Sequence, residues 1–469
     1  MSDSEPIPSA APLAALRHPA TIRLRCAAIT RAVADDVSLN FTIDRSRLDA
    51  CAARVEAVIR RRFPDLRVPP HSRWRHFEAG GVDRRAELEA LLEGRSAADR
   101  LRAMVDLTVV SVLLDAGAGA RWRYVESRQG QRAAALPAHR QSRDDLMAML
   151  DAAVSAAAPA ADAQPAAPAE PTPAVADEGR SYTRSEGLGV ASFRAFVDGV
   201  FSADRDDPLR VDAATLKTID AAALRAVFQA SPSNPLVGLE GRAGLLARLG
   251  SALEAEAALD GGAARPSLVI DRLTAGHTRT QIDASDLLGG LLSTYAPIWT
   301  SGSSIRGSLA GDVWSHRWAG DAAAGGRDPM TEGWVPFHKL TQWLAYSLVE
   351  PLQWSGLVVT GTEALTGLPE YRNGGLLIDD GVIVPRDPAD LRKTWKPSQE
   401  FVVEWRALTV TLLDELAARV RERLGPAGAA LPLACILEGG TWQAGREAAA
   451  ERRSGGAPPV QLDSDGTIF

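Results

Sequence analysis

Apolar residues recur at helical spacing over much of the chain. Leu48, Val55, Val58, Ile59 and Phe63 fall on one face of a helix over residues 48–63. Ser96 is a suitable N-cap for an apolar stretch that ends at the DAGAG sequence. The same periodicity predicts helices at 88–92, 96–117, 190–201, 212–229, 242–258, 336–353, 401–424 and 441–453.

One segment has the pattern of β-structure. Residues 375–384, GLLIDDGVIV, place a DG pair between two short apolar arms, which is typical of a hairpin turn. The predicted fold is therefore mainly α: a compact multi-helix domain with a few short β-strands.

An alanine- and proline-rich tract interrupts the helical pattern between residues 151 and 180. It lacks the bulky side chains that a core requires, so we predict that it is disordered. The tract could separate two domains, one ending near residue 150 and one beginning near residue 180. It could equally be an insertion within one domain, because DAGAGARWRY and YTRSEGLGVASF, on either side, both have the composition of packed sequence.

Composition and charge argue against two classes of binding partner, nucleic acids and membranes. The formal net charge is −7, which argues against a large basic surface for nucleic acid or an anionic membrane. The longest apolar run, residues 107–114, is too short for a membrane helix, and the acidic N-terminus is unlike a signal peptide. We therefore expect a cytoplasmic protein with no nucleic-acid and no membrane partner.

Cysteines and standard motifs indicate neither a metal site nor a nucleotide cofactor. Cys26, Cys51 and Cys435 are scattered, with no CxxC pair. The chain has no GxxxxGK[ST], no GxGxxG after a strand, no HExxH and no GxSxG. We expect no cofactor and no metal ion, and acid–base chemistry on a small anionic ligand.

Tryptophan directs attention to the second half of the chain. Nine of the eleven tryptophans fall between Trp299 and Trp442, where polar residues also gather. An indole can stack on a flat ligand, although it fills a core equally well. In the helix predicted from residue 336, Lys339 and Gln342 share a face and follow His338. These side chains could bind an anion or simply face solvent.

Two further segments carry ionisable groups. The glycine-rich segment 363–382 contains Tyr371, Arg372, Asn373 and Asp379, which could contact a ligand or stabilise turns. In the predicted helix 401–424, Glu404 lies at the edge of the buried stripe. A partly desolvated carboxylate suits acid–base work, unless a neighbouring arginine pairs with it. Arg406 could be such a partner for an acid of another element, or an anion clamp.

Two glycine pairs precede predicted helix starts, where exposed amides attract anions. Glu438 comes just before one pair, with Trp442 and Arg446 after it, and Arg84 follows the other pair. An ordinary capped helix is the alternative in both places.

Two aspartates stand apart from these segments. Asp115 ends a long apolar helix, where the macrodipole disfavours a negative charge by roughly 0.3–1 kcal/mol. That unfavourable placement indicates a role, although capping of the following glycine turn is the ordinary alternative. Asp312 lies in the GDVWSH sequence before the tryptophan-rich helix.

Eight blocks together resemble a known family. They read SVLLDAGAG, RSEGLGVASF, GDVWSH, PFHKLTQWLAYSLVEPLQW, LTGLPEYRNGGLLIDDGVI, VEWRALTV, LEGGTWQAGRE and SDGTIF. In this order they resemble the uracil-catabolism protein family, the fourth component of the fungal and bacterial pathway that converts uracil to urea through nucleotide intermediates. The resemblance implies a disordered N-terminus at 1–20 and one catalytic unit over 21–469, interrupted by an insertion at about 132–178.

The resemblance also implies a reaction. The pathway requires that a ribosylurea 5′-phosphate be split to urea and ribose phosphate, and the family is similar to queuosine-salvage ribosylhydrolases related to DNA glycosylases. An N-glycosidic bond breaks through an oxocarbenium-like state that a carboxylate stabilises. We expect the catalytic carboxylates among Asp115, Asp312, Asp379 and Glu404. The expected substrate-binding residues are Arg84, His338, Lys339, Gln342, Tyr371, Arg372, Asn373, Arg406, Glu438, Trp442 and Arg446.

Two other functions remain open from the sequence. A phosphoribosyltransferase uses an apolar strand that ends in two acids, and Asp379 and Asp380 do follow LLI, but the phosphate loop of that class is missing. A non-catalytic partner of the ring-opening enzyme would instead expose a large apolar patch. The expected partners are a small nucleotide substrate and, by association, other enzymes of the uracil pathway.

Overall fold

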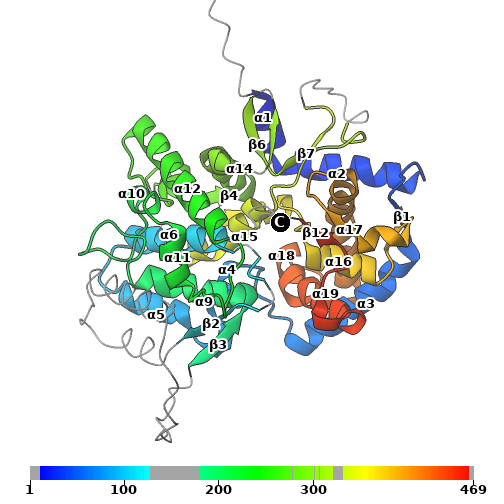
Figure 1. Ribbon diagram of the computed structural model, residues 1–469, viewed down its shortest axis with the longest axis horizontal. Coiled ribbons are helices and arrows are strands. Elements are labelled where there is room, and N and C mark those ends of the chain that lie inside the picture. Colours follow the sequence, from blue (N-terminus) through cyan, green and yellow to red (C-terminus); the bar gives the residue numbers. More distant parts are fainter. Residues whose placement is uncertain are drawn as a thin grey trace, which may run out of the picture.

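The computed structural model describes residues 11–115, 117–119, 121–126, 179–276, 278–299, 302–305, 307–320 and 331–463, and it is mainly helical as predicted (Figure 1). The helices before residue 127 are α1 (Ala11–Leu16), α2 (Pro19–Ala34), α3 (Leu48–Arg62), α4 (Arg73–Phe77), α5 (Arg84–Leu91) and α6 (Ala97–Leu113). The later helices are α9 (Arg184–Val197), α10 (Ala213–Leu216), α11 (Ala221–Val227), α12 (Leu239–Asp260), α13 (Leu268–Leu273), α14 (Ala284–Tyr295), α15 (Lys339–Trp354), α16 (Tyr371–Asp379), α17 (Glu400–Leu424), α18 (Leu433–Ile436) and α19 (Trp442–Arg452).

The strands among the described residues form two-stranded ladders that tie distant parts of the chain together. The antiparallel ladders are β1 (Phe41–Ile43) with β10 (Ile383–Pro385), β2 (Arg123–Glu126) with β3 (Arg180–Thr183), β5 (Ser303–Ile305) with β6 (Ser308–Gly311), and β7 (Val313–Ser315) with β8 (Trp334–Pro336). The parallel ladders are β4 (Gln281–Asp283) with β9 (Val358–Thr360), and β11 (Thr394–Trp395) with β12 (Gln461–Leu462).

Helix periodicity located most long helices correctly. α12 and α17 span the predicted ranges, whereas α3, α6 and α15 begin or end up to four residues inside theirs. The Ser96 hydroxyl accepts a hydrogen bond from the Asp99 amide at 3.1 Å, as an N-cap does. The helix predicted at 212–229 is instead two short helices, α10 and α11. Asp220 interrupts it, because its carboxylate caps α11 by accepting from the Ala223 amide at 2.8 Å.

The predicted β-hairpin at 375–384 is wrong. These residues form the second half of α16, a turn, and β10, which pairs with β1 rather than with its own neighbour. Glu370 caps α16 by accepting from the amides of Arg372 and Asn373 at 2.8 and 2.6 Å. The DG pair is the helix end, where Gly381 adopts a φ of +77°. A short apolar run flanked by glycine is compatible with either structure.

One hydrophobic core runs through the described chain from Ile22 to Val460. In Figure 1, the cyan and green helices α6, α9 and α12 lie on one side of the molecule, and the yellow-to-red helices α16, α17 and α19 lie on the other. α15 lies between these two sides and packs against α4, α6 and α14. The junction of the two sides therefore brings together segments that are far apart in sequence.

Part of the N-terminal segment that we expected to be disordered is helical. α1 packs Leu13 and Leu16 against Ile305, Ala310 and Val313 in a small second core. The Leu16 carbonyl oxygen lies 3.0 Å from the His338 Nε2 atom, so this core is tied to the residue that precedes α15.

The predicted insertion at 132–178 lies outside the described residues, and so do residues 1–10 of the N-terminal segment. β2 and β3, which flank residues 127–178, pair over four residues from Arg123–Thr183 to Glu126–Arg180. Within the described ranges, no helix is both long enough and apolar enough to cross a membrane.

His338 predicts an acid-dependent loss of stability. Burial lowers the pKa of His338 from 6.5 to about 4. Between these two values the unfolded chain binds a proton that the folded chain does not bind, so stability is lost as the pH falls from 6.5 toward 4. The difference corresponds to about 3 kcal/mol. Denaturation in guanidinium chloride over this pH range is expected to show a shallower acid-induced loss in His338→Asn, and an unchanged slope would contradict the assignment.

Candidate functional site

Buried and half-buried polar side chains gather at the junction of the two sides of the molecule. They come from the loop before α4, from α4 itself, from the end of α6, from α15, and from the helical run α18–α19. We call this set the junction cluster: His71, Arg73, His76, Asp115, Lys339, Trp343, Glu438 and Trp442.

Arg73 lies at the centre of this cluster and is fully buried. Its Nε donates to the Ser111 hydroxyl at 2.6 Å, and its Nη1 donates to the Ser185 carbonyl at 3.2 Å. The same Nη1 lies 3.3 Å from Oδ2 of Asp115, which follows Leu114, the C-cap residue of α6. The guanidinium carbon is also 5.7 Å from the centre of the Trp343 ring. Arg73 therefore supplies the positive charge that offsets a carboxylate at the C-terminal end of α6.

Three neighbouring buried atoms have no hydrogen-bond partner among the described residues. They are Arg73 Nη2, Asp115 Oδ1 and Trp343 Nε1. A buried donor or acceptor without a partner costs about 1–3 kcal/mol, and these three atoms lie around one ion pair, whereas other such atoms, for example Trp74 Nε1, lie elsewhere in the described chain. Two donors and one acceptor around a single guanidinium form a site for a polar ligand that can both accept and donate hydrogen bonds.

His76 is held as a neutral hydrogen-bond donor. Its Nδ1 lies 3.1 Å from Arg73 Nη1, which can only donate, so Nδ1 accepts and the proton of the neutral ring is on Nε2. Burial and the charge of Arg73 keep the pKa of His76 well below 6.5. His76 therefore offers an Nε2–H group without adding a positive charge.

Lys339 is a half-buried cation at the first position of α15. Burial lowers its pKa, and the carboxylates of Glu370 and Asp115 act in the opposite direction. Within the described part of the chain, its ammonium group forms no hydrogen bond or ion pair of its own. Such a cation is suited to bind an anionic group of a ligand.

Glu438 and His71 form a close pair beside the two indoles. The His71 Nδ1 and Glu438 Oε2 atoms are 2.8 Å apart, and Arg62 Nη2 lies 3.3 Å from the other carboxylate oxygen. The His71 ring centre is 6.2 Å from that of Trp343 and 6.4 Å from that of Trp442. His71 therefore faces the same two tryptophans as His76, whose ring centre is 5.7 and 6.4 Å from them.

The glycine pair after Glu438 is not a helix start, so that expectation was wrong. α18, a π-helical turn at Leu437–Thr441, and α19 form one continuous helical run. A Cβ atom at Gly440 would lie 2.5 Å from Val55 of α3, and one at Gly439 would lie 2.7 Å from Val68. These glycines allow close packing of the π-helical turn and do not expose amides to an anion. π-Helical turns often occur at functional sites.

The start of α16 borders the junction cluster. Tyr371 and Arg372 follow the capping residue Glu370, and the guanidinium carbon of Arg372 lies 4.9 Å from the centre of the Tyr371 ring. Burial raises the pKa of Tyr371, and the charges of Glu370 and Asp115 also contribute. Arg446 of α19 lies 5.0 Å from the Trp442 ring and pairs with Glu186 at 3.4 Å. These residues, predicted from the sequence, lie at the edge of the cluster.

Asp312 and Arg406 pair with each other instead of facing a ligand. Arg406 Nη1 and Nη2 donate to the two carboxylate oxygens of Asp312 at 2.7 and 2.8 Å. The carboxylate also accepts from Trp314 Nε1 at 2.7 Å and from the Lys339 amide at 3.0 Å. Asp312 thus stabilises the first turn of α15 and positions Lys339.

The other predicted residues have structural partners. Gln342 exchanges hydrogen bonds with Thr366, at 2.6 and 2.9 Å, and Asn373 accepts from Thr441 at 2.8 Å. Asp379 binds Arg453 through both oxygens, at 2.8 and 2.5 Å. Glu404 accepts from Ser38 and Asn40.

Arg84 also has a structural role. Its Nη2 pairs with Glu126 at 2.5 Å, and its Nη1 donates to the Phe77 and Ala79 carbonyls at 2.7 and 3.0 Å. Nε lies 3.3 Å from the other Glu126 oxygen, and Nη2 also reaches the Tyr182 hydroxyl at 3.1 Å. Every nitrogen of this guanidinium is therefore occupied by protein groups.

Sequence reasoning missed His71, Arg73, His76 and Trp343 as site residues. The first three lie within PHSRWRHF, where two histidines and two arginines flank one tryptophan. That density of basic and aromatic residues is the signal that could have found them. No group of three or more His, Cys, Asp or Glu side chains in the described ranges is arranged to hold a metal ion.

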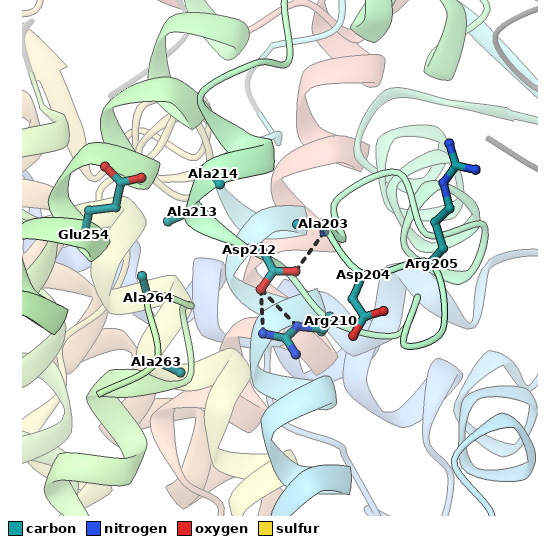
Figure 2. Close-up of a pocket in the computed structure, with 10 residues that line it drawn as sticks. All are labelled: Ala203, Asp204, Arg205, Arg210, Asp212, Ala213, Ala214, Glu254, Ala263 and Ala264. Carbon is teal, nitrogen blue, oxygen red and sulfur yellow. Dashed lines mark hydrogen bonds and ion pairs between the residues drawn. The ribbon is translucent and has the colours of Figure 1, made fainter. Parts of the chain in front are cut away.

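A surface pocket of about 540 Å³ lies apart from this cluster, beside α10 and α12 (Figure 2). Arg210 Nε and Nη2 donate to Asp212 Oδ1 there at 2.9 and 2.6 Å, and the Ala203 amide donates to the other oxygen at 2.8 Å. These groups satisfy one another, whereas the junction cluster contains buried polar atoms without partners. The junction cluster is therefore the better candidate site.

Comparison with known proteins identifies a matching family and two relatives of this chain. Residues 15–137 and 164–469 match the family described as "Protein of unknown function (DUF1688)". The chain is 36% identical over 438 residues to "Protein urg3" of Schizosaccharomyces pombe, which covers 92% of each chain. It is 34% identical over 460 residues to "Uracil catabolism protein 4" of Lachancea kluyveri, again with 92% of each chain covered. Residues 138–163 of this chain have no counterpart in the family match.

Proposed function

This chain belongs to the family described as protein of unknown function (DUF1688), and on that basis we propose that it acts in uracil catabolism, for which one relative is named. The proposed reaction is hydrolysis of the N-glycosidic bond of a ring-opened uridine nucleotide, ribosylurea 5′-phosphate, to urea and ribose 5-phosphate. The junction cluster is the proposed active site.

The observation that carries this proposal is the group of unpartnered buried atoms around Arg73. Asp115 Oδ1 is an acceptor, while Arg73 Nη2 and Trp343 Nε1 are donors. Urea is a small planar group with a carbonyl acceptor and amide donors, so it can satisfy donors and an acceptor together. The Nε2–H of His76 adds a further neutral donor on the same side of Trp343.

Charges in the cluster match the remaining parts of the substrate. The ribosyl C1′ gains positive charge as its bond to nitrogen breaks, and Asp115 supplies a buried negative charge beside it. The 5′-phosphate is an anion, and Lys339 supplies a half-buried cation whose ammonium group has no hydrogen bond or ion pair to the residues that the structure describes. Trp343 and Trp442 exclude water from the reacting centre.

The phosphoribosyltransferase alternative depended on two acids at the end of an apolar strand, and the structure has no strand there. Asp379 and Asp380 end a helix rather than a strand, and Asp379 is bound by Arg453. Neither acid is arranged as in the strand and phosphate loop of that class. The hydrolase is therefore the function that we propose.

Incubation of the purified protein with ribosylurea 5′-phosphate tests the proposal directly. We expect equal amounts of urea and ribose 5-phosphate to form without any added co-substrate. Urea formation that requires phosphoribosyl pyrophosphate would support the transferase instead. Absence of reaction with both, at protein concentrations in excess of substrate, would reject an enzyme of either kind.

Lys339→Met is expected to weaken binding of the phosphorylated substrate selectively. The side chain keeps its length but loses a charge-assisted hydrogen bond of about 1.5–3 kcal/mol, which corresponds to a 10- to 100-fold higher KM. The KM for ribosylurea without its phosphate should not change. Lys393→Met, at an exposed lysine that pairs with Asp390, serves as the matched control. An equal effect on both substrates would contradict phosphate binding by Lys339.

A further inference from the structure

His71 and Glu438 form an imidazole–carboxylate pair. The proposed binding of substrate by Arg73, Asp115 and Lys339 does not involve this pair. We infer that His71 Nε2 is the general base that activates the attacking water, and that Glu438 is the positioning residue that fixes its ring. This inference rests on the proposed reaction and assigns its proton transfer.

The tautomer of His71 follows from its partner. Glu438 is buried, which raises its pKa, but the hydrogen bond from His71 and the charge of Arg62 act in the opposite direction, and the net shift of the pKa is downward. An ionised carboxylate only accepts, so Nδ1 of His71 carries the proton and donates over 2.8 Å. In the neutral ring, Nε2 is then a free acceptor, as a general base requires.

The position of the ring is fixed on several sides. The His71 amide donates to the Ala434 carbonyl at 2.9 Å, which ties the residue to α18. Arg62 Nη1 donates to the Glu438 carbonyl at 2.5 Å, and Arg62 Nη2 holds the side chain of the same residue. The π-helical turn that carries Glu438 is packed against Val55 and Ile59 of α3 through its glycines. The pair is therefore a preorganised unit.

His71 and His76 have opposite hydrogen-bond roles beside the same indoles. Nδ1 donates in His71 but accepts in His76, so Nε2 accepts in the first ring and donates in the second. One ring is thus set to take a proton, and the other is set to polarise the urea carbonyl. The rings of Trp343 and Trp442 contact both, which puts the two functions in one site.

The proton transfer balances without an additional reactant. The water oxygen forms a bond to C1′ while the C1′–N bond breaks, and one water proton passes to His71 Nε2. The imidazolium then returns that proton to the departing nitrogen. Urea and ribose 5-phosphate leave, and the His71 ring is neutral again.

Kinetics of two variants test these roles. His71→Ala is expected to lower kcat by about 100- to 10,000-fold with little change in KM, and added imidazole should restore part of the rate. Glu438→Gln should lower kcat less, by about 10- to 100-fold. Imidazole should not accelerate the wild type or Asp115→Asn. Retention of kcat in His71→Ala, or a loss that imidazole does not restore, would overturn the assignment.

A second measurement keeps the His71–Glu438 pair testable even if the protein releases no urea. Nitrogen-15 NMR of histidine-labelled protein reports which ring nitrogen carries the proton. We expect His71 to be protonated at Nδ1 and not at Nε2, and to lose this preference in Glu438→Gln. A proton on Nε2 in the wild type would overturn the inference, whereas absence of urea release alone would reject only the proposed reaction.

Discussion

Asp115→Asn is expected to abolish nearly all urea release, lowering kcat by about 100- to 1,000-fold. The substitution keeps the shape of the side chain but removes the only negative charge within 4.0 Å of Arg73 among the described residues. The rate falls because no neighbouring anion then stabilises the positive charge that develops at C1′. Steady-state measurement of urea formation from ribosylurea 5′-phosphate compares the kcat of Asp115→Asn with that of the wild type.

Two comparisons separate the loss of catalysis in Asp115→Asn from a general loss of structure: the change in KM, and the activity of a variant at a control carboxylate. KM should rise by less than kcat falls, because the interaction strengthens only as the bond breaks. Asp49→Asn, at an exposed aspartate that pairs with Arg419, should retain wild-type activity. A kcat in Asp115→Asn within a factor of three of the wild type would remove Asp115 from the chemistry.

Asp312→Asn is expected to cause a large loss of stability, about 3–5 kcal/mol in the free energy of unfolding. The substitution leaves the guanidinium of Arg406 buried without its charge partner, and it weakens the acceptor for the Lys339 amide. Arg406 is 1% exposed, so solvent cannot compensate. Denaturation in guanidinium chloride at neutral pH measures the loss.

The double variant Asp312→Asn/Arg406→Met distinguishes a broken ion pair from poor packing. Removal of the stranded charge should recover more than half of the lost stability. Asp414→Asn, in a half-exposed pair with Arg23, should cost less than about 1 kcal/mol. A double variant no more stable than Asp312→Asn would contradict the ion-pair explanation.

The long helices were predictable because their apolar positions repeat over several turns. α17 buries Phe401, Trp405, Leu408 and Leu412, and that repeat is visible in the sequence. α16 was not recognised, because LLI is short and lies between glycines and a DG pair. The helix start is set by Glu370, whose carboxylate accepts hydrogen bonds from the amides of Arg372 and Asn373. These hydrogen bonds cannot be identified from the sequence.

Asp115 could be singled out from the sequence because its position at a helix end is electrostatically unfavourable, and the structure places it beside the buried Arg73; its catalytic role stays a prediction. His71 was missed because it lies in the loop before α4, and His76 was missed because α4 has only five residues, too few to display a period. Asp312 was expected to be catalytic, and the sequence gives no sign that Arg406, 94 residues later, occupies both of its oxygens. Ion pairs between distant segments decide which buried acids remain available for chemistry.

A crystal structure of the protein with bound ribose 5-phosphate tests most directly whether the junction cluster is the active site. The account predicts that the phosphate lies against Lys339 and that the ribosyl ring lies between Asp115 and the Trp343 indole. Ribose 5-phosphate bound elsewhere, for example in the surface pocket at Arg210 and Asp212, with the junction cluster closed to it, would contradict the account.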